Sequence, residues 1–196
     1  MQIVGLTGNI GSGKTFVANL FANKNIAIYN SDEKAKFLMN NNFELKQKII
    51  EKFGSDSYQN NSLNKKYIAD QIFNNKVLLE WMNQLIHPAV KTDFESWVNT
   101  NNDFPYVIKE AAILIESKAY LDCDSIILVT APEKIRIKRV MSRDNLTEDQ
   151  VSQRILNQMT EIEKEKYADF IIKNDGTLVV KDQVDSIHEK LIQRIL

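Results

Sequence analysis

The chain has 196 residues, 43% hydrophobic and 26% charged, which are ordinary values for a globular protein with one good-sized core or a core with inserted lobes. Its 25 basic and 26 acidic residues nearly cancel, which argues against a surface that coats nucleic acid. The single cysteine, Cys123, excludes an intrachain disulfide and suits a reducing compartment. The sequence has no run of 18 apolar residues and no leader-like N-terminus, so we expect a cytoplasmic protein without a membrane partner.

Five short apolar segments predict the strands of a parallel sheet. They are residues 2–7, 26–29, 106–110, 125–130 and 169–174. Residues 14–24 and 177–196 have helical spacing, and Pro132 suits the first turn of a further helix. Strands that alternate with helices predict an α/β fold with a five-stranded parallel sheet covered on both faces, and with ligands at the carboxyl ends of the strands.

A long helical stretch, from Ser31 to about Asn99, interrupts this alternation and predicts an inserted lobe. Short Asn-rich segments at 40–42, 57–62 and 99–103 are interpreted as surface turns or hinges.

The segment "GNIGSGKT", residues 8–15, matches G-x-x-x-x-G-K-S/T at every fixed position, between a buried strand and an amphipathic helix. Glycines let backbone N–H groups approach phosphate oxygens, and the helix directs its positive end at the same anion. The residues expected to bind a nucleotide are Asn9, Ile10, Gly11, Ser12, Gly13, Lys14 and Thr15. Lys14 would reach the β- and γ-phosphates, and the Thr15 hydroxyl would bind Mg²⁺. The alternative is a glycine-rich turn with an incidental lysine, a chance match expected in roughly one chain in a hundred.

Acidic residues decide which kind of phosphate-binding protein this is. A complete Asn-Lys-x-Asp element for reading guanine is absent from the sequence. The strand at 125–130 ends without an acidic residue, so Glu110 is the only candidate for an acid that supports a metal. Asp32 follows the second strand, where a carboxylate can take the proton of an acceptor hydroxyl or hold Mg²⁺ through water. Equally, Ser31 or Asp32 can merely cap the next helix.

Four of the five arginines fall in one short stretch of the chain. Arg136, Arg139 and Arg143 have the i, i+3, i+7 spacing of one helical face. Arginines that close over a transferring phosphoryl group would stabilise its charge and exclude water, which predicts a catalytic lid. The alternative is a solvated basic face paired with neighbouring acidic residues.

Motifs along nearly the whole chain resemble those of the dephospho-CoA kinase family. They are "GLTGNIGSGKT", "NSDEKA", "LNKKYIADQIF" followed by "LIHPAV", "AAILIES", "TAPEKIRIKRVMSRD", "RILNQM" and "YADFIIKNDG". The family phosphorylates the ribose 3′-hydroxyl of dephospho-CoA, the last step of coenzyme A synthesis. The resemblance implies a three-layer P-loop kinase fold, Mg²⁺ with ATP as cofactor, and dephospho-CoA as the second ligand. It also implies a monomer or weak homo-oligomer without nucleic-acid or membrane partners.

The resemblance further implies three parts of the chain and roles for individual residues. The parts are a nucleotide-binding core (1–30, 101–131 and 167–196), a helical dephospho-CoA-binding lobe (31–100) and a lid (132–166). The implied catalytic residues are Asp32 as general base, with Lys14 and Arg139 at the transferring phosphoryl group. The implied substrate-binding residues are Asp32, Lys65, His87 and Glu116. The further nucleotide-binding residues are Arg136, Arg143, Asn174 and Gly176.

Several interpretations stay open beside the resemblance. A histidine before Pro88 at a helix end, as His87 is expected to be, is as readily a packing or capping residue. The chain departs from the family pattern at Asn30, where the first aspartate of Asp-Ala-Asp is usual, at Lys65, where arginine is common, and at Ala112, where proline is common. Another P-loop nucleoside or nucleotide kinase, and an ATP-binding module without transfer activity, remain as alternatives.

Overall fold

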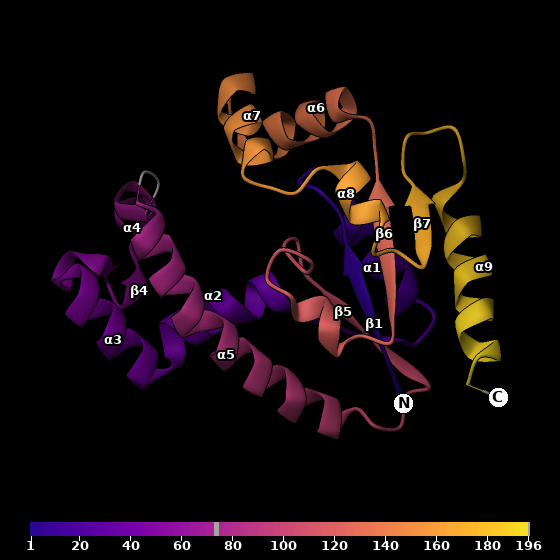
Figure 1. The fold of residues 1–196 in the computed structure, drawn as a ribbon, viewed down its shortest axis with the longest axis horizontal. Coiled ribbons are helices and arrows are strands. Elements are labelled where there is room, and N and C mark those ends of the chain that lie inside the picture. The colour runs from indigo at the N-terminus through magenta and orange to yellow at the C-terminus, as the bar shows by residue number, and fades with distance from the viewer. Residues whose placement is uncertain (73–74, 196) are drawn as a thin grey trace. The chain divides into compact units, whose positions relative to one another are not determined.

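The computed structural model describes residues 1–72 and 75–195 (Figure 1). Phe73 and Asn74, inside the predicted lobe, and Leu196, at the end of the predicted closing helix, lie outside the described residues. The chain divides into two compact units, which we call the core unit (Met1–Asn30 with Thr100–Leu196) and the helical lobe (Ser31–Asn99).

The core unit contains a sheet of five parallel strands in the order β2-β5-β1-β6-β7. The strands are β1 (Gln2–Thr7), β2 (Ala27–Asn30), β5 (Tyr106–Glu110), β6 (Ser125–Thr130) and β7 (Phe170–Lys173). The predicted α/β class and five-stranded parallel sheet are confirmed; β2 begins and ends one residue later than expected. The chain leaves β1 toward one side of the sheet for β2 and β5 and adds β6 on the other side, and the carboxyl end of a strand at such a switch point is where ligands bind.

One face of the sheet is covered by α1 (Lys14–Ala22) and α9 (Val180–Gln193), and Figure 1 shows α9 beside β7. Apolar residues two apart on the strands and three or four apart on these helices meet in one buried cluster, as the two periodicities require. The cluster includes Val4, Leu6, Val17, Phe21, Ile108, Ile127, Val129, Ile172, Val184 and Leu191. On the other face, Ala111, Leu114 and Ile126 pack with a short 3₁₀ helix, Ala119–Asp122. Burial of each large apolar side chain contributes roughly 1.5–3 kcal/mol.

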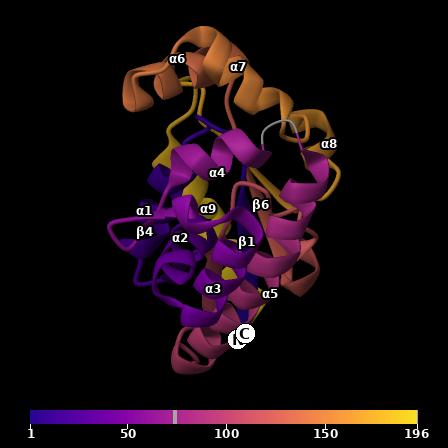
Figure 2. The same ribbon diagram turned by 90° about the vertical axis from the view of Figure 1, so that its left-hand side faces the viewer.

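Three helices follow β6: α6 (Glu133–Asp144), α7 (Glu148–Leu156) and α8 (Glu161–Glu165). Figure 1 shows α6 and α7 beyond the carboxyl end of β6, and Figure 2 shows the three helices in sequence in orange. Thr147 and Thr160 begin α7 and α8 with capping boxes, in which each threonine oxygen accepts a backbone N–H of the first turn. The segment that the sequence marks as a lid is therefore made of three helices, the last two of which begin with capping boxes.

In its described residues the helical lobe contains four α-helices, a short 3₁₀ helix (Ser55–Ser57) and one small hairpin. The helices are α2 (Ser31–Asn41), α3 (Phe43–Phe53), α4 (Lys65–Ile72) and α5 (Lys76–Thr100), whose last residue belongs to the core unit. The hairpin pairs β3 (Tyr58–Gln59) with β4 (Ser62–Leu63) in antiparallel fashion. Its two-residue loop, Asn60 and Asn61, has φ values of 49° and 66°. Sequence reasoning took this segment for a turn alone and missed the two strands.

The long helix α5 continues through Pro88. The expectation that His87 and Pro88 stand at a helix end is therefore wrong. Ile86 and Val90, on either side of the proline, are both buried, so packing holds the helix together across the lost N–H. Within residues 1–72 and 75–195, none of the helices has both the length and the apolar character needed to span a bilayer.

Replacing Tyr106 by Phe should lower the free energy of unfolding by about 1 kcal/mol near neutral pH. The buried Tyr106 and His188 Nδ1 share a hydrogen bond of 2.6 Å that joins β5 to α9. Burial lowers the pKa of His188 below its usual 6.5, so the neutral, accepting ring contributes stability that is fully present above 6.5 and is lost as the pH falls through the lowered pKa.

The difference between parent and variant should therefore shrink as the pH falls from about 8 to about 5, as measured by urea unfolding. Tyr120→Phe, whose ring packs edge-on against Tyr167, is the control. A difference that does not change with pH would show that the bond does not depend on neutral His188.

Candidate active site

The loop of residues 8–13 leaves the carboxyl end of β1 and runs directly into α1. Gly11 and Gly13 have φ values of 81° and 97°, the left-handed region that favours glycine. A Cβ atom at Gly11 would lie 2.5 Å from the carbonyl oxygen of Arg136. Gly13 is the N-cap of α1 and has no side chain to cap the first amides of that helix, which leaves them to an anion. The loop is therefore built for phosphate.

The carbonyl groups of the loop are bound from outside. One guanidinium nitrogen of Arg139 donates to the carbonyl oxygens of Gly11, at 3.3 Å, and Ser12, at 3.4 Å. The Asn174 side chain, just after β7, donates to the Ser12 oxygen at 2.7 Å, and its own backbone oxygen accepts from Arg139 at 3.0 Å. Helix α6 and the end of β7 thus hold the loop by its acceptors, which suits a loop that binds phosphate with its donors.

Two side chains at the start of α1 point in different directions. Lys14 Nζ donates to the carbonyl oxygen of Gly8 at 3.0 Å, so the lysine folds back over the loop. Thr15 Oγ1 donates to Glu110 Oε1 at 3.2 Å. The other carboxylate oxygen of Glu110 accepts from the side chain of Asn30 at 3.0 Å, because the register of β2 and β5 sets these two residues side by side. Glu110, only 4% exposed, is therefore fixed by both neighbours.

Thr15 and Glu110 have the chemistry of magnesium ligands. Mg²⁺ takes oxygen ligands at about 2.0–2.1 Å in octahedral geometry, so two adjacent ligands lie about 3 Å apart. The 3.2 Å between Thr15 Oγ1 and Glu110 Oε1 fits that spacing. Sequence reasoning left Glu110 as the one candidate acid, and the fold brings it to Thr15.

The three arginines of α6 have different surroundings. Arg136 is 5% exposed and lies 3.5 Å from the Glu133 carboxylate. Arg139 lies on the loop carbonyls. Arg143, with a mostly exposed side chain, forms an ion pair with Asp144 at 2.7 Å. The spacing predicted one helical face for all three arginines. In the structure Arg139 contacts the loop, whereas Arg136 and Arg143 pair with acidic neighbours.

The residues implied for the acceptor lie mainly in the helical lobe. Asp32 is the second residue of α2 and is exposed. Lys65 begins α4 and is also exposed. His87, in α5, is half-buried, and burial lowers the pKa of its ring.

Glu116 belongs to the core unit, in the segment that follows β5. Its Oε1 atom accepts from Lys164 Nζ at 2.9 Å and from the backbone N–H of Met159 at 3.1 Å. Gly176, in the loop after β7, has a φ of 88°, and open space surrounds the position of a Cβ there.

Two contacts of the loop were not foreseen from the sequence. The Asn9 side chain donates to the carbonyl oxygen of Met159 at 3.1 Å, and the Ile10 N–H donates to Gln158 Oε1 at 2.9 Å. Gln158 and Met159 belong to the "RILNQM" motif, but sequence reasoning gave neither a role. Their membership in that motif is the one signal that could have pointed to them.

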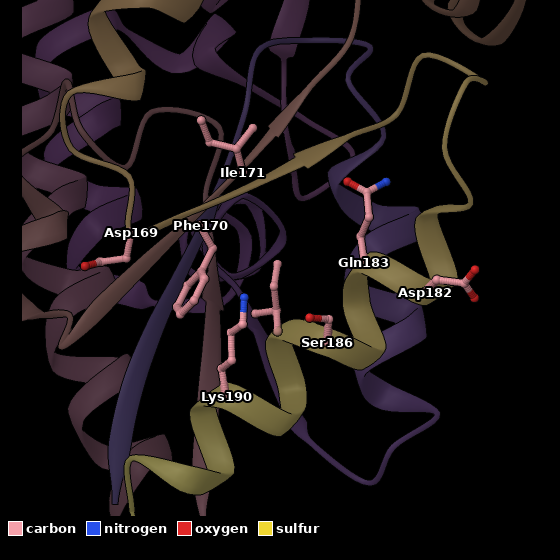
Figure 3. Close-up of a pocket in the computed structure, with 8 residues that line it drawn as sticks. Asp169, Phe170, Ile171, Asp182, Gln183, Ser186 and Lys190 are labelled. Atoms are coloured by element: carbon pink, nitrogen blue, oxygen red, sulfur yellow. The ribbon is translucent and has the colours of Figure 1, made fainter.

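A hollow at the sheet edge lies away from this site. Figure 3 shows it between β7 and α9, lined by residues such as Phe170, Asp182 and Lys190. Nearby, the Gln183 side chain accepts from the Lys173 N–H and donates to the Lys173 oxygen, both at 2.9 Å, and so pairs with the edge strand. The hollow has no glycine turn at a helix start, so we assign phosphate binding to the loop after β1.

The fold and the loop together define a P-loop kinase: a five-stranded parallel sheet with a phosphate-binding loop between its central strand and α1. A family model described as dephospho-CoA kinase matches residues 2–180. The chain therefore belongs to the dephospho-CoA kinase family and is a kinase enzyme.

Known proteins agree with this membership. The dephospho-CoA kinase of Bacteroides fragilis (strain YCH46) is 33% identical over 192 residues, which cover 98% of this chain and 94% of that protein. The dephospho-CoA kinase of Porphyromonas gingivalis is 39% identical over 161 residues, 82% of this chain and 79% of that protein. The crystal structure of TT1252 from Thermus thermophilus has a TM-score of 0.84 and 26% identity, and the match covers 100% of this chain and 98% of that one.

Gly11→Ala should destabilise the fold more than Gly54→Ala. Both glycines have left-handed φ values, 81° and 86°, so both variants carry backbone strain of about 1–3 kcal/mol. A methyl group at position 11 must also displace the backbone of Arg136, whereas nothing lies within 4 Å of one at position 54. Urea unfolding of both variants measures the difference. Equal losses would show that α6 yields to the methyl group without cost.

Proposed function

We propose that the chain transfers the γ-phosphoryl group of ATP to the ribose 3′-hydroxyl of dephospho-CoA, giving coenzyme A and ADP. The observation that carries this proposal is the family match over residues 2–180, which includes the phosphate-binding loop, Asp32 and helix α6 with its three arginines. We also propose that the chain works in the cytoplasm, as expected from its sequence.

In the proposed mechanism the loop and α1 hold the triphosphate. Amides of the loop bind phosphate oxygens, and Lys14, now over the Gly8 carbonyl, turns to the β- and γ-phosphates. Thr15 and Glu110 are the oxygen donors proposed to hold Mg²⁺, with Asp32 as a further donor through water. Bound with ATP, this metal would neutralise phosphate charge.

The proposed transfer step needs one base and two cations. Asp32 takes the proton of the 3′-hydroxyl as that oxygen bonds to the γ-phosphorus, and the bond from the γ-phosphorus to the ADP oxygen breaks. Lys14 and Arg139 stabilise the negative charge on the transferring group. The position of Arg139 on the Gly11 and Ser12 carbonyls supports this role, because its guanidinium already lies at the loop.

The remaining contacts are proposed from the resemblance and from where the side chains lie. Lys65 and His87 would bind the acceptor from the helical lobe. Glu116 Oε1 is engaged with Lys164, so a contact with the acceptor would use Oε2. The further residues proposed for the nucleotide are Arg136, Arg143, Asn174 and Gly176, the last two through their backbone at the adenine.

Release of ADP tests the acceptor directly. The purified chain with ATP and Mg²⁺ should release ADP when dephospho-CoA is added, and much less with AMP, shikimate or nucleosides. Equal turnover of all these acceptors would defeat the proposal.

Asp32→Asn should lower kcat by a factor of roughly 10²–10⁴ while ATP binding persists, because the variant removes the proton acceptor but leaves the loop intact. Steady-state kinetics and calorimetric titration with ATP measure the two effects. Glu33→Gln, at the next position of the same helix, is the control and should keep its turnover. Unchanged kcat in the Asp32 variant would rule out the carboxylate as the base.

Glu110→Gln should weaken the binding of Mg²⁺ in the presence of ATP by roughly 10- to 100-fold, because a neutral amide replaces the charged oxygen next to Thr15. ATP binding without metal should change little. Titration of Mg²⁺ into the chain with bound ATP, followed by calorimetry, measures the metal without relying on turnover. An unchanged metal affinity would remove Glu110 from the proposed site.

A further inference from the structure

The segment between α7 and α8, residues 157–160, is attached to the first half of the phosphate-binding loop. Gln158 Oε1 accepts from the Ile10 N–H at 2.9 Å, and the Met159 carbonyl accepts from the Asn9 side chain at 3.1 Å. Asn9 is 3% exposed. A segment nearly 150 residues away along the chain therefore fixes two successive loop residues.

The same segment is anchored on its other side by an ion pair whose lysine is buried. Lys164 has no exposed surface, and its ammonium lies 2.9 Å from Glu116 Oε1 and 3.0 Å from the Ala112 carbonyl oxygen. The same Glu116 oxygen accepts from the Met159 N–H at 3.1 Å. Because a buried ammonium needs all of its partners, the pair leaves Glu116 little freedom, and Glu116 in turn fixes the main chain at Met159.

The link from the ion pair to the segment is short and stiff. The Thr160 capping box starts α8 directly after Met159, and Lys164 lies one turn further along the same helix. The main chain of Met159 is thus held at its nitrogen by Glu116 and at its oxygen by Asn9. Gln158, the preceding residue, has its backbone position set by these contacts.

We propose that Gln158, held through Met159 by the Glu116–Lys164 pair, is a positioning residue that keeps the first half of the phosphate-binding loop in its binding shape before the nucleotide arrives. The inference rests on the proposed function only in taking ATP as the ligand of the loop. A loop ordered in advance loses less conformational entropy on binding, so its affinity for phosphate rises without a new contact to the ligand. The Ile10 amide is committed to Gln158, which assigns phosphate binding to amides further along the loop.

Gln158→Ala should raise the dissociation constants of ADP and of ATP by a similar factor of roughly 3 to 10, which corresponds to one hydrogen bond. Calorimetric titration without any acceptor measures both values. Gln153→Ala is the matched control, because Gln153 is exposed on α7. Unchanged affinities would overturn the proposal, and so would a loss for ATP without a loss for ADP, which would indicate a direct contact with the γ-phosphate.

Exchange of the Ile10 amide with deuterium reports on the loop itself, so it separates a local effect on the loop from a change in overall stability. By NMR, its protection in the nucleotide-free protein should fall about tenfold in Gln158→Ala, remain in Gln153→Ala, and return in Gln158→Glu, which keeps an accepting oxygen. Unchanged protection in Gln158→Ala would overturn the proposal.

A second variant tests the anchor. Lys164→Met keeps the length and bulk of the side chain but removes the ammonium group that pairs with Glu116. This variant should therefore also lose protection at the Ile10 amide. Full protection at Ile10 in folded Lys164→Met would remove the ion pair from the proposal; if this variant does not fold, the Gln158 variants decide alone. None of these measurements uses an acceptor, so their outcome is independent of the dephospho-CoA assay. Failure of the proposed function would appear in that assay, as an unaltered chain that releases no ADP in response to the acceptor.

Discussion

A loop that binds phosphate with its amides must have its carbonyl groups satisfied elsewhere, and this requirement organises the core unit. Each backbone group has a donor or an acceptor to satisfy, and a turn that gathers amides on one side exposes carbonyls on the other. Lys14 donates to the carbonyl oxygen of Gly8, Arg139 to those of Gly11 and Ser12, and Asn174 to that of Ser12. The helix after β6 and the residue after β7 therefore support the loop after β1, and the order of the strands makes this support reachable.

The acidic side of the site depends on the same sheet order. Because β5 lies between β1 and β2, the residue that ends β5 faces both Thr15 and Asn30. An aspartate at position 30, usual in the family by resemblance, would set a second carboxylate beside Glu110, and two such neighbours resist ionising together. The amide of Asn30 donates to Glu110 instead and keeps its carboxylate oriented. The departure at this position is thus accommodated by a hydrogen bond across β2 and β5, and the net charge next to Thr15 is smaller.

Local patterns predicted the parts of this arrangement whose cause is local. The strands β1, β5 and β6 are short apolar runs with the expected bounds, and the loop follows from its glycines and lysine. The β3–β4 hairpin was not predicted, because strands of two residues are too short to show an alternation of apolar and polar side chains, although asparagines favour hairpin turns. The helix α5 passes through Pro88 because burial on both sides outweighs the local preference of proline. The contact of Gln158 with Ile10 joins elements that only the folded topology brings together.

The buried lysine at position 164 shows why packing alone does not account for this site. Moving an ammonium out of water costs several kcal/mol, and an apolar side chain of similar size would often be as stable. An apolar residue would fill the space, but it would not orient Glu116, whose Oε1 atom accepts from both Lys164 and the Met159 N–H. The second acceptor is the backbone oxygen of Ala112, which any residue supplies, so this bond does not depend on the side chain at position 112. The geometry of the segment that holds the loop, rather than the stability of α8, is what the charged pair specifies.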